Sequence, residues 1–276
     1  MRVSWAVIAV VLMAAPARAE ESPAAREVMS HLSRGARSAR VGDWVTYRFD
    51  GGAGGQRIYY WRMAVVGEEK DKQGRDAVWV EMEAGTHPAM KSPLMQMRML
   101  VAREGEQIRY DAISRLFVGG PTDRPQEYSE EALDHVLKKM DQQEKDDKDG
   151  KVVDPEDAKV TLPAGMKPVL RTGKEMRVMT LAGTVTVVPV EVMVKKTVIK
   201  RMWISREIPL MQMAKMEIPG IAHSMEVAEY GIDAKPRMVL PPPSAPKIRL
   251  EYADRVFPDL PGMDAPQEPA DSEKTP

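Results

Sequence analysis

Apolar and polar residues alternate along most of this chain, which is the pattern of β-strands with one buried and one solvated face. In Leu94–Val101, for example, Met95, Met97 and Met99 alternate with polar or cationic residues. Short polar or glycine-containing turns separate the alternating stretches, so we expect meanders of antiparallel strands. The predicted strands are Trp44–Phe49, Ile58–Val66, Ala77–Ala84, Leu94–Val101 and Gln107–Val118 in a first block, and Glu175–Leu181, Thr184–Val194, Thr197–Ser205, Leu210–Ile218 and Met225–Tyr230 in a second.

Two stretches have helical rather than strand periodicity. Ser22-Pro23 has the residue types of a helix N-cap and first helical position, which predicts a short helix near the start of the chain. Ser129, followed by two glutamates, is the candidate N-cap of a second helix with a single apolar stripe. The stripe consists of Leu133, Val136, Leu137 and Met140. The charge run Asp141–Asp157 that follows is typical of a solvated loop.

The first nineteen residues have the three parts of a secretory signal peptide. Arg2 gives a positive start, Val3–Ala15 is apolar, and Ala17-Arg18-Ala19 is a small-x-small cleavage pattern. The apolar run is shorter than the roughly 20 residues that a membrane-spanning helix needs. We therefore expect cleavage after Ala19 and a mature protein that is periplasmic or secreted.

These elements divide the chain into four predicted parts. They are a signal peptide at 1–19, an N-terminal helix at 20–40, a single antiparallel-sheet domain at 41–238 and a tail at 239–276. The sheet domain has a helical and charged insertion at about 128–157. The tail carries nine prolines from Pro241 onward, which predicts disorder. The predicted fold class is α+β: a strongly curved antiparallel sheet, incomplete and half-barrel-like, with about two helices packed on it.

Charge and cysteine content exclude several classes of function. After cleavage, 38 Lys+Arg (40 less Arg2 and Arg18) face 41 Asp+Glu, which gives no reason to expect a nucleic-acid partner. No later segment is apolar for long enough to cross a bilayer, so we do not expect an integral membrane protein. The absence of cysteine excludes disulfides, thiolate metal sites and a lipid-modified N-terminal cysteine.

The unusual residue is methionine, of which the chain has 21 against only 3 Phe. Because alternate residues of a strand share a face, methionines of the fourth and ninth predicted strands form two stripes. The stripes are Met95, Met97 and Met99 in one strand and Met211 and Met213 in the other, and Met216 of the second strand completes the set of candidate binding residues. Flexible thioethers suit a plain core or an adaptable lipid-binding wall, and they are also Cu(I) ligands. All three interpretations remain open at this point.

One five-residue sequence occurs twice. Pro93–Met97 reads Pro-Leu-Met-Gln-Met, and so does Pro209–Met213. Each copy follows a predicted strand that contains a tryptophan, Trp79 or Trp203. Two related strands in similar sheet positions would explain the repeat, and so would coincidence in a methionine-rich chain.

Other candidate sites are weak. Lys145–Glu156 partly matches a calcium-binding loop, but Lys145 stands where the first acidic ligand is required. The four histidines are scattered without metal-ligand spacing, and motifs of nucleophilic hydrolases and phosphate-binding loops are absent. We therefore predict no cofactor and no resident metal, and a protein that is not an enzyme.

The order of elements resembles that of the LolA-like superfamily of periplasmic lipoprotein and lipid carriers. The residues that carry the resemblance are Val41-Gly42-Asp43-Trp44-Val45 at the first strand and Met202–Leu210, a strand followed by a polar turn and Pro-Leu. The resemblance covers about Ser22 to Met238, and the charge run and proline tail depart from it. It implies a curved sheet whose concave apolar face is covered by helices and accepts acyl chains. In that arrangement the methionine stripes would line the face, and Leu133, Val136, Leu137 and Met140 would form a lid.

The function predicted from these observations is non-enzymatic binding of an apolar ligand, either a lipid or an acylated protein, in the cell envelope. The first alternative is a structural or scaffold protein that binds envelope proteins. The second is Cu(I) binding through the methionine clusters.

Overall fold

The computed structural model describes residues 40–50, 58–105, 107–121, 123–148, 169–194, 196–219 and 223–253. The predicted signal peptide and N-terminal helix lie outside these ranges, as does most of the calcium-loop match at Lys145–Glu156. Within the described ranges, no helix is long and apolar enough to span a membrane.

The first half of the chain forms a meander of antiparallel strands and one long helix. The strands are β1 (Trp44–Asp50), β2 (Ile58–Lys70), β3 (Asp76–Gly85), β4 (Met95–Glu104), β5 (Gln107–Gly119) and β6 (Gln126–Glu127), and the helix is α3 (Glu130–Lys148). All five strands predicted in this block coincide with β1 to β5. The helix extends into the charge run that was expected to be a loop, because Gln, Glu and Lys favour the helical backbone even without an apolar face.

The second half forms another meander and a short terminal turn. Its elements are β7 (Val169–Thr172), β8 (Met176–Thr180), β9 (Gly183–Val194), β10 (Thr197–Ile204), β11 (Met213–Ile218), β12 (His223–Gly231) and the 3-10 helix η1 (Leu250–Tyr252). Of these strands only β7 was not predicted. Four residues are too few for alternation to identify a strand.

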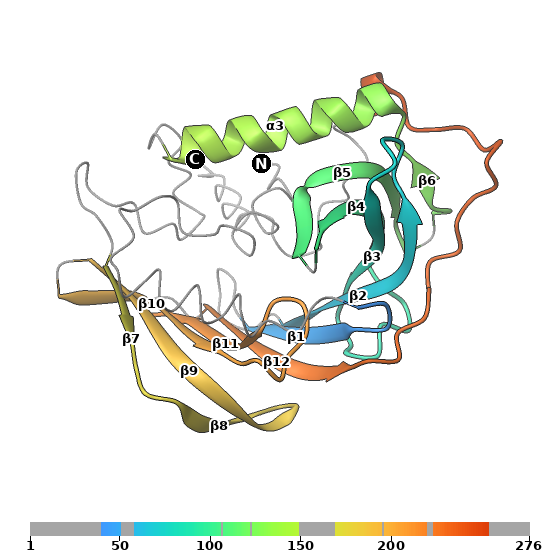
Figure 1. The fold of residues 1–276 in the computed structure, drawn as a ribbon. Helices are drawn as coiled ribbons and strands as arrows, with labels where there is room; N and C mark the ends of the chain where they lie inside the picture. The colour runs from blue at the N-terminus through green and yellow to red at the C-terminus, as the bar shows by residue number, and fades with distance from the viewer. Residues whose placement is uncertain are drawn as a thin grey trace, which may run out of the picture.

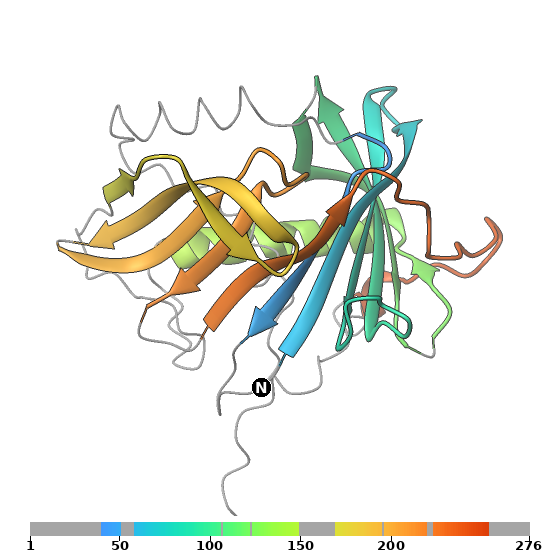
Figure 2. The ribbon, with the colours of Figure 1, turned by 90° about the horizontal axis from the view of Figure 1, so that it is seen from below.

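The two meanders form one continuous sheet because the first and last long strands pair. The strand order is β6-β5-β4-β3-β2-β1-β12-β11-β10-β9-β7, with β8 also pairing with β9, and all pairings are antiparallel. The sheet curves strongly around the side that α3 occupies (Figure 1). The β8–β9 hairpin bends under the opposite side, where the N–H of Ala182 donates to the carbonyl of Val227 at 3.3 Å (Figure 2).

This architecture corrects the predicted fold class of a half-barrel-like sheet with about two helices. The described residues contain one α-helix, and the twelve strands form one large, mostly unclosed sheet. The central β1–β12 pairing doubles the width of the sheet, which local alternation could not reveal. At its far end the sheet bends away from α3 instead of curving on toward closure.

The sheet has two faces that bury different residues. We call the side toward α3 the inner face; in the first half it carries Val45, Met63 and Val80, whose cluster includes Leu133 of the helix. We call the opposite side the outer face, where Trp79 and Phe117 form a smaller cluster with Met238. The rings of Trp79 and Phe117 lie 5.9 Å apart. Both faces of the first meander are thus partly covered, which explains the long buried runs in its strands.

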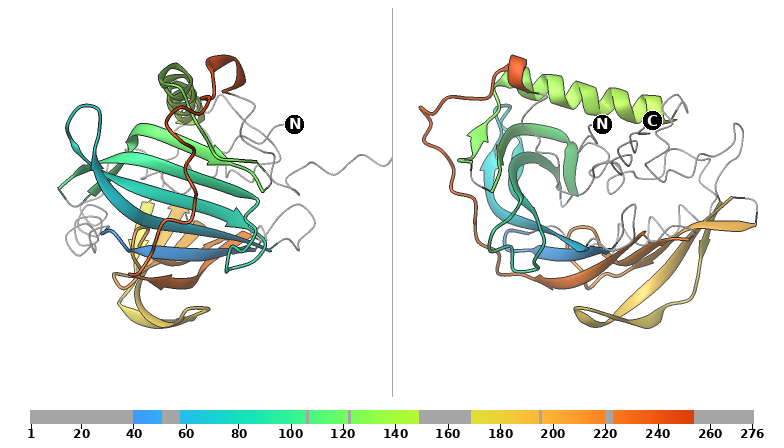
Figure 3. Two further views of the ribbon diagram at one scale, coloured as in Figure 1. Left: turned by 90° about the vertical axis from the view of Figure 1, so that its right-hand side faces the viewer. Right: turned by 180° about the vertical axis from the view of Figure 1, so that it is seen from behind.

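The chain after β12 covers the outer face and returns to the helix. We call Ile232–Ala253 the C-terminal strap; it runs along the outside of the first meander to the start of α3 (Figure 3). Ile248 and Ala253 are buried, and Ile248 forms a parallel bridge with Tyr128. The expectation of a disordered tail from residue 239 is therefore wrong as far as Ala253, because backbone hydrogen bonds and buried side chains hold this stretch. Residues 254–276 lie outside the described ranges.

Candidate ligand-binding face

Methionines of the inner face form two rows that run across the strands. Met63, Met82 and Met97 lie opposite one another on β2, β3 and β4, and we call them the first methionine row. The second methionine row is Met225, Met216 and Met202, on β12, β11 and β10. Directly opposed side chains in antiparallel strands have Cβ atoms about 4.5–5.5 Å apart, so thioethers in each row contact their neighbours. The inner face therefore carries two bands of flexible apolar side chains.

The structure places the six predicted methionines on this apolar cluster, though not as two similar stripes. Met95, Met99, Met213 and Met216 are buried, whereas Met97 and Met211 are only partly buried. The two groups belong to β4 and to the region of β11, separated by four strands. Met211 lies in the turn before β11 and not on a strand. The predicted methionines therefore belong to one apolar cluster that spans several strands, and do not form two separate stripes along single strands.

The predicted lid residues belong to α3 and face the same cluster. Leu133 and Val136 are buried in it, and Leu137 is partly buried against it, while the side chain of Met140 lies outside the described residues. The helix begins as predicted, with Ser129 Oγ accepting a hydrogen bond from the backbone N–H of Ala132 at 3.3 Å.

The N-terminal end of α3 is where the helix is attached. Its main contacts with other elements are with η1 and β5. The N–H of Ser129 donates to the carbonyl of Ile248 at 2.9 Å, and Lys72 pairs with Glu130 at 3.4 Å. From this end the helix extends across the open side of the curved sheet (Figure 1). Among the described residues, the contacts of α3 are therefore concentrated at its N-terminal end.

Four methionines of the two rows were not singled out from the sequence. Met63, Met82, Met202 and Met225 are single methionines within otherwise mixed strands, so no run drew attention to them. The signal that could have found the first row is hairpin register, because β2, β3 and β4 are consecutive. The second row depends on the pairings of β10, β11 and β12. Register irregularities occur in the β10–β11 pairing and in the adjacent β9–β10 pairing.

A buried polar atom also faces the apolar surface. Trp61 shares the inner face with Tyr47 and Ala84, its partners on β1 and β3. Its indole Nε1 is buried without a hydrogen-bond partner among the described residues, and its ring lies 6.1 Å from that of Phe49. An N–H left unpaired in an apolar setting costs free energy and can be satisfied by a ligand acceptor.

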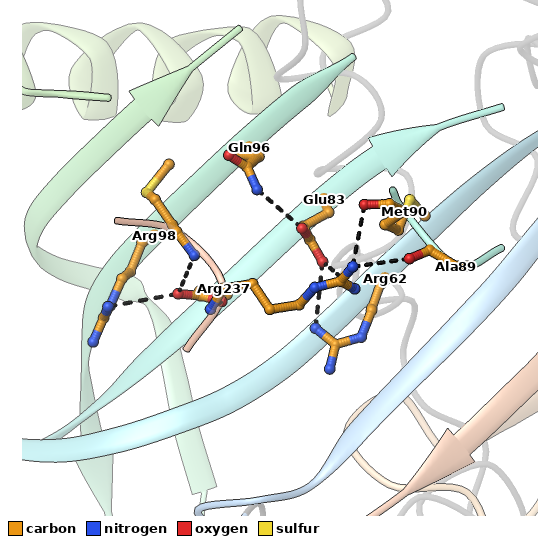
Figure 4. A network of polar contacts seen from close by, with 9 residues as sticks. Arg62, Glu83, Ala89, Met90, Gln96, Arg98 and Arg237 are labelled. Atoms are coloured by element: carbon orange, nitrogen blue, oxygen red, sulfur yellow. Dashed lines mark hydrogen bonds and ion pairs between the residues drawn. The ribbon is translucent and has the colours of Figure 1, made fainter. Parts of the chain in front are cut away.

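The outer face carries a buried ionic network that holds the C-terminal strap (Figure 4). Glu83 accepts from Arg237 at 3.0 Å, from Arg62 at 3.4 Å and from Gln96 at 3.0 Å. Glu81 accepts the backbone N–H groups of Arg237 and Met238 at 2.9 and 3.2 Å.

Burial dominates the electrostatics of this network. It raises the pKa of Glu81, although backbone hydrogen bonds from the strap and the charge of Arg98 act in the opposite direction. It also lowers the pKa of Arg62, against the attraction of Glu83. Every carboxylate oxygen of Glu81 and Glu83 has a donor from the strap or from a neighbouring strand. The network is therefore a structural clamp, and its groups are occupied with one another.

Metal ligands do not gather in the part of the chain that the structure describes. No group of three or more His, Asp or Glu side chains there could hold a metal ion. His87 is exposed and its Nδ1 accepts the N–H of Ala89 at 3.1 Å, while His135 lies on α3. His31 and the side chain of His223 are outside the described residues.

Comparisons with known proteins give only weak likenesses. No protein family and no curated protein matches this sequence. Among solved structures the chain is similar to MucB, which has a LolA-like fold, with 14% identity and a TM-score of 0.32 over 77% of this chain and 61% of MucB. It is also similar to a putative exported protein with a YmcC-like fold from Bacteroides fragilis, with 11% identity and a TM-score of 0.28 over 70% of this chain and 96% of that one. This chain thus spans about three fifths of MucB. These likenesses say nothing about what this chain binds.

Proposed function

We propose that this protein is an exported, non-enzymatic carrier that holds an apolar ligand, a lipid or an acylated protein, between its inner face and α3. The observation that carries the proposal is the pair of cross-strand methionine rows opposite the apolar stripe of a helix held mainly at one end. Export follows from the signal peptide expected at residues 1–19.

Methionine is suited to this role because its side chain is unbranched and polarisable. It adapts to ligands of variable shape with little strain, whereas leucine or phenylalanine would define a fixed surface. A helix attached at its N-terminal end can move away from the sheet without breaking a strand pairing. Both features support reversible binding of a flexible chain over a purely structural core.

The first test is native mass spectrometry of the mature protein purified from its own compartment. We expect added mass that corresponds to a phospholipid, a free acyl chain or an acylated peptide. A clean apo mass from gently purified protein would contradict the carrier proposal.

A matched pair of variants connects such binding to the inner face. Met97→Trp enlarges a partly buried residue of the first methionine row, whereas Met179→Trp changes an exposed methionine on β8. We expect the first variant to lose bound lipid several-fold while its circular dichroism is unchanged, and the second to retain it. Equal retention in both folded variants would mean that the ligand lies elsewhere.

The second candidate, a scaffold protein that binds envelope proteins, is favoured by one observation. β8 lies at an edge of the sheet, pairs with β9, and exposes Met176 and Met179 at 48 and 75%. Leu181 in the turn after β8 is 51% exposed. Exposed edge strands can accept a partner strand. A photo-crosslinking residue at position 179 that gave one dominant protein adduct, with none at exposed position 239, would favour this candidate.

The third candidate, Cu(I) binding, has less support. Four of the six methionines are buried in the apolar cluster, where sulfur is not presented to an incoming ion. The same mass spectra test it, since a copper adduct has its own mass.

A further inference from the structure

Lys200 lies on the inner face, among apolar residues. On β10 it stands two residues before Met202 of the second methionine row, and its partner on β9 is Val192. Because alternate residues of a strand share a face, Lys200 projects to the same side as Met202. Its side chain is partly buried. A cation thus stands at the margin of the methionine-lined surface.

Among the described residues, no acidic group balances this charge. Lys200 has no hydrogen bond or ion pair with any described residue, and burial, acting alone, lowers its pKa. Its neighbour Arg201 behaves differently: on the outer face its Nε donates to Glu191 at 3.1 Å, and Glu191 is also bound by Arg171.

The carboxylates of the neighbouring described strands lie on the outer face. Glu217, opposite Arg201, pairs with Lys215 at 2.8 Å, and Glu226 is opposite Lys215. Carboxylates on these strands therefore cannot reach the inner face, because side-chain direction is set by the strand register. A partly desolvated ammonium without a counter-charge lowers stability unless an anion is bound.

We infer that the apolar ligand is an anionic amphiphile, whose acidic head group pairs with Lys200 while its chain lies along the methionine rows. This inference rests on the proposed carrier function and adds the chemical class of the ligand. Carboxylate and phosphate head groups share the required charge. A lysine that merely extends its ammonium to water would have no preference among head groups.

Binding of three probes to the delipidated mature protein distinguishes these cases. The probes are palmitate, 16:0 lysophosphatidylglycerol and the neutral monopalmitoylglycerol, and the variants are Lys200→Gln, Lys200→Arg and the outer-face control Lys215→Gln. We expect Lys200→Gln to lower the affinity for the anionic probes about tenfold, which corresponds to the loss of one charge-assisted contact. The affinity for the neutral probe should fall less than twofold. Lys200→Arg and Lys215→Gln should bind like the wild type. If palmitate binds and lysophosphatidylglycerol does not, the site selects a carboxylate head group. If both anionic probes bind, the site accepts either head group.

Two results would overturn the inference, and a third would overturn the proposed function as well. Equal weakening of all probes, or no weakening, would show that Lys200 does not select charge. Failure of the wild type to bind any probe would contradict the carrier function itself.

Thermal unfolding of ligand-free Lys200→Met tests the role of the unpaired charge without any ligand. We expect an unchanged or higher Tm because an unpaired charge is removed, and a clear fall would instead indicate a structural role for Lys200.

Discussion

Arg237 of the C-terminal strap and Glu83 of β3 form an ion pair of 3.0 Å on the outer face, where the Glu83 side chain is only 2% exposed. The same guanidinium donates to the carbonyls of Ala89 and Met90 at 2.8 and 3.1 Å. One side chain thus joins the strap, a central strand and the β3–β4 loop. Loss of this residue leaves a buried carboxylate with fewer donors, and such losses are costly.

We therefore expect Arg237→Ala to lower the free energy of unfolding by about 2 kcal/mol, below the full cost of a buried pair because the arginine is partly exposed. Urea denaturation measures the change. Arg249→Ala removes an exposed arginine of the same strap and should change stability by less than about 0.5 kcal/mol. Identical curves for both variants would mean that the pair does not hold the strap.

The base of the helix should respond to pH through Glu127. Burial would raise its pKa, but hydrogen bonds from Arg115 and Lys247 outweigh burial and keep the pKa below its usual value of 4.5. Because the folded pKa is the lower one, this stabilisation is present above the unfolded pKa and is lost as the pH falls through the folded pKa.

Glu127→Gln should consequently have a lower free energy of unfolding than the wild type at pH 7. This gap between the two free energies should narrow below about pH 4. Denaturation at a series of pH values tests this. Glu251→Gln, an exposed change on η1, should show no such gap at any pH. A gap that stays constant down to pH 3 would mean that charge is not the cause.

The N-cap of α3 makes a separate prediction about the lid. Ser129→Ala removes the acceptor for the Ala132 N–H and should cost about 1 kcal/mol, whereas Ser129→Asp keeps an acceptor and adds a favourable charge at the helix N-terminus. Thermal unfolding and hydrogen exchange of the α3 amides measure the effect. Faster exchange in Ser129→Asp than in Ser129→Ala would contradict it.

Gly42 is required where β1 meets the start of the strap. It has φ of +102°, and a Cβ there would lie 2.4 Å from the carbonyl oxygen of Ile232. Its own carbonyl accepts the N–H of Ala234 at 2.8 Å. Gly42→Ala should lower the unfolding free energy by about 3 kcal/mol, through backbone strain together with the clash.

Gly74 is the matched control, since its φ is +77° but nothing lies within 4 Å of an added Cβ. Gly74→Ala should therefore cost only the backbone strain, about 1 kcal/mol. A similar loss for the two variants in urea would mean that the contact with Ile232 is relieved by a small shift.

Much of the local structure could be predicted from particular residues. Alternation located ten of the twelve strands, and Ser129 with its two glutamates located the start of α3. Leu133 and Val136 do bury toward the sheet, as their spacing indicated. These features depend on neighbours within a few residues, where side-chain direction follows from backbone period. The two short strands, β6 and β7, gave no such signal.

Features that join distant segments could not be predicted. The pairing of Phe49 with Met225 makes one sheet from two meanders, and the burial of Glu83 depends on Arg237. Lys200 could not be singled out from the sequence because its lack of an ion pair depends on which face each neighbouring carboxylate occupies, and that is set by the strand pairings. Alternation predicts that the polar face of a strand is solvated. In β3 the strap instead covers Glu81 and Glu83 and supplies hydrogen bonds that make their burial possible.

The repeated pentapeptide shows most directly what the sequence determines and what the tertiary structure decides. The sequence alone determined that both copies are apolar, strand-flanking segments rich in methionine. In Pro93–Met97 the N–H of Leu94 donates to Ala84, and the chain enters β4 against β3. In Pro209–Met213 the same letters form a turn with φ of 66° at Leu210 and 53° at Gln212, whose carbonyl accepts the N–H of Ser205 at 2.7 Å. Only the tertiary structure decided between strand and turn. The side chains of the two copies are identical, so the difference comes from the backbone hydrogen-bond partners that the surrounding structure offers to each copy.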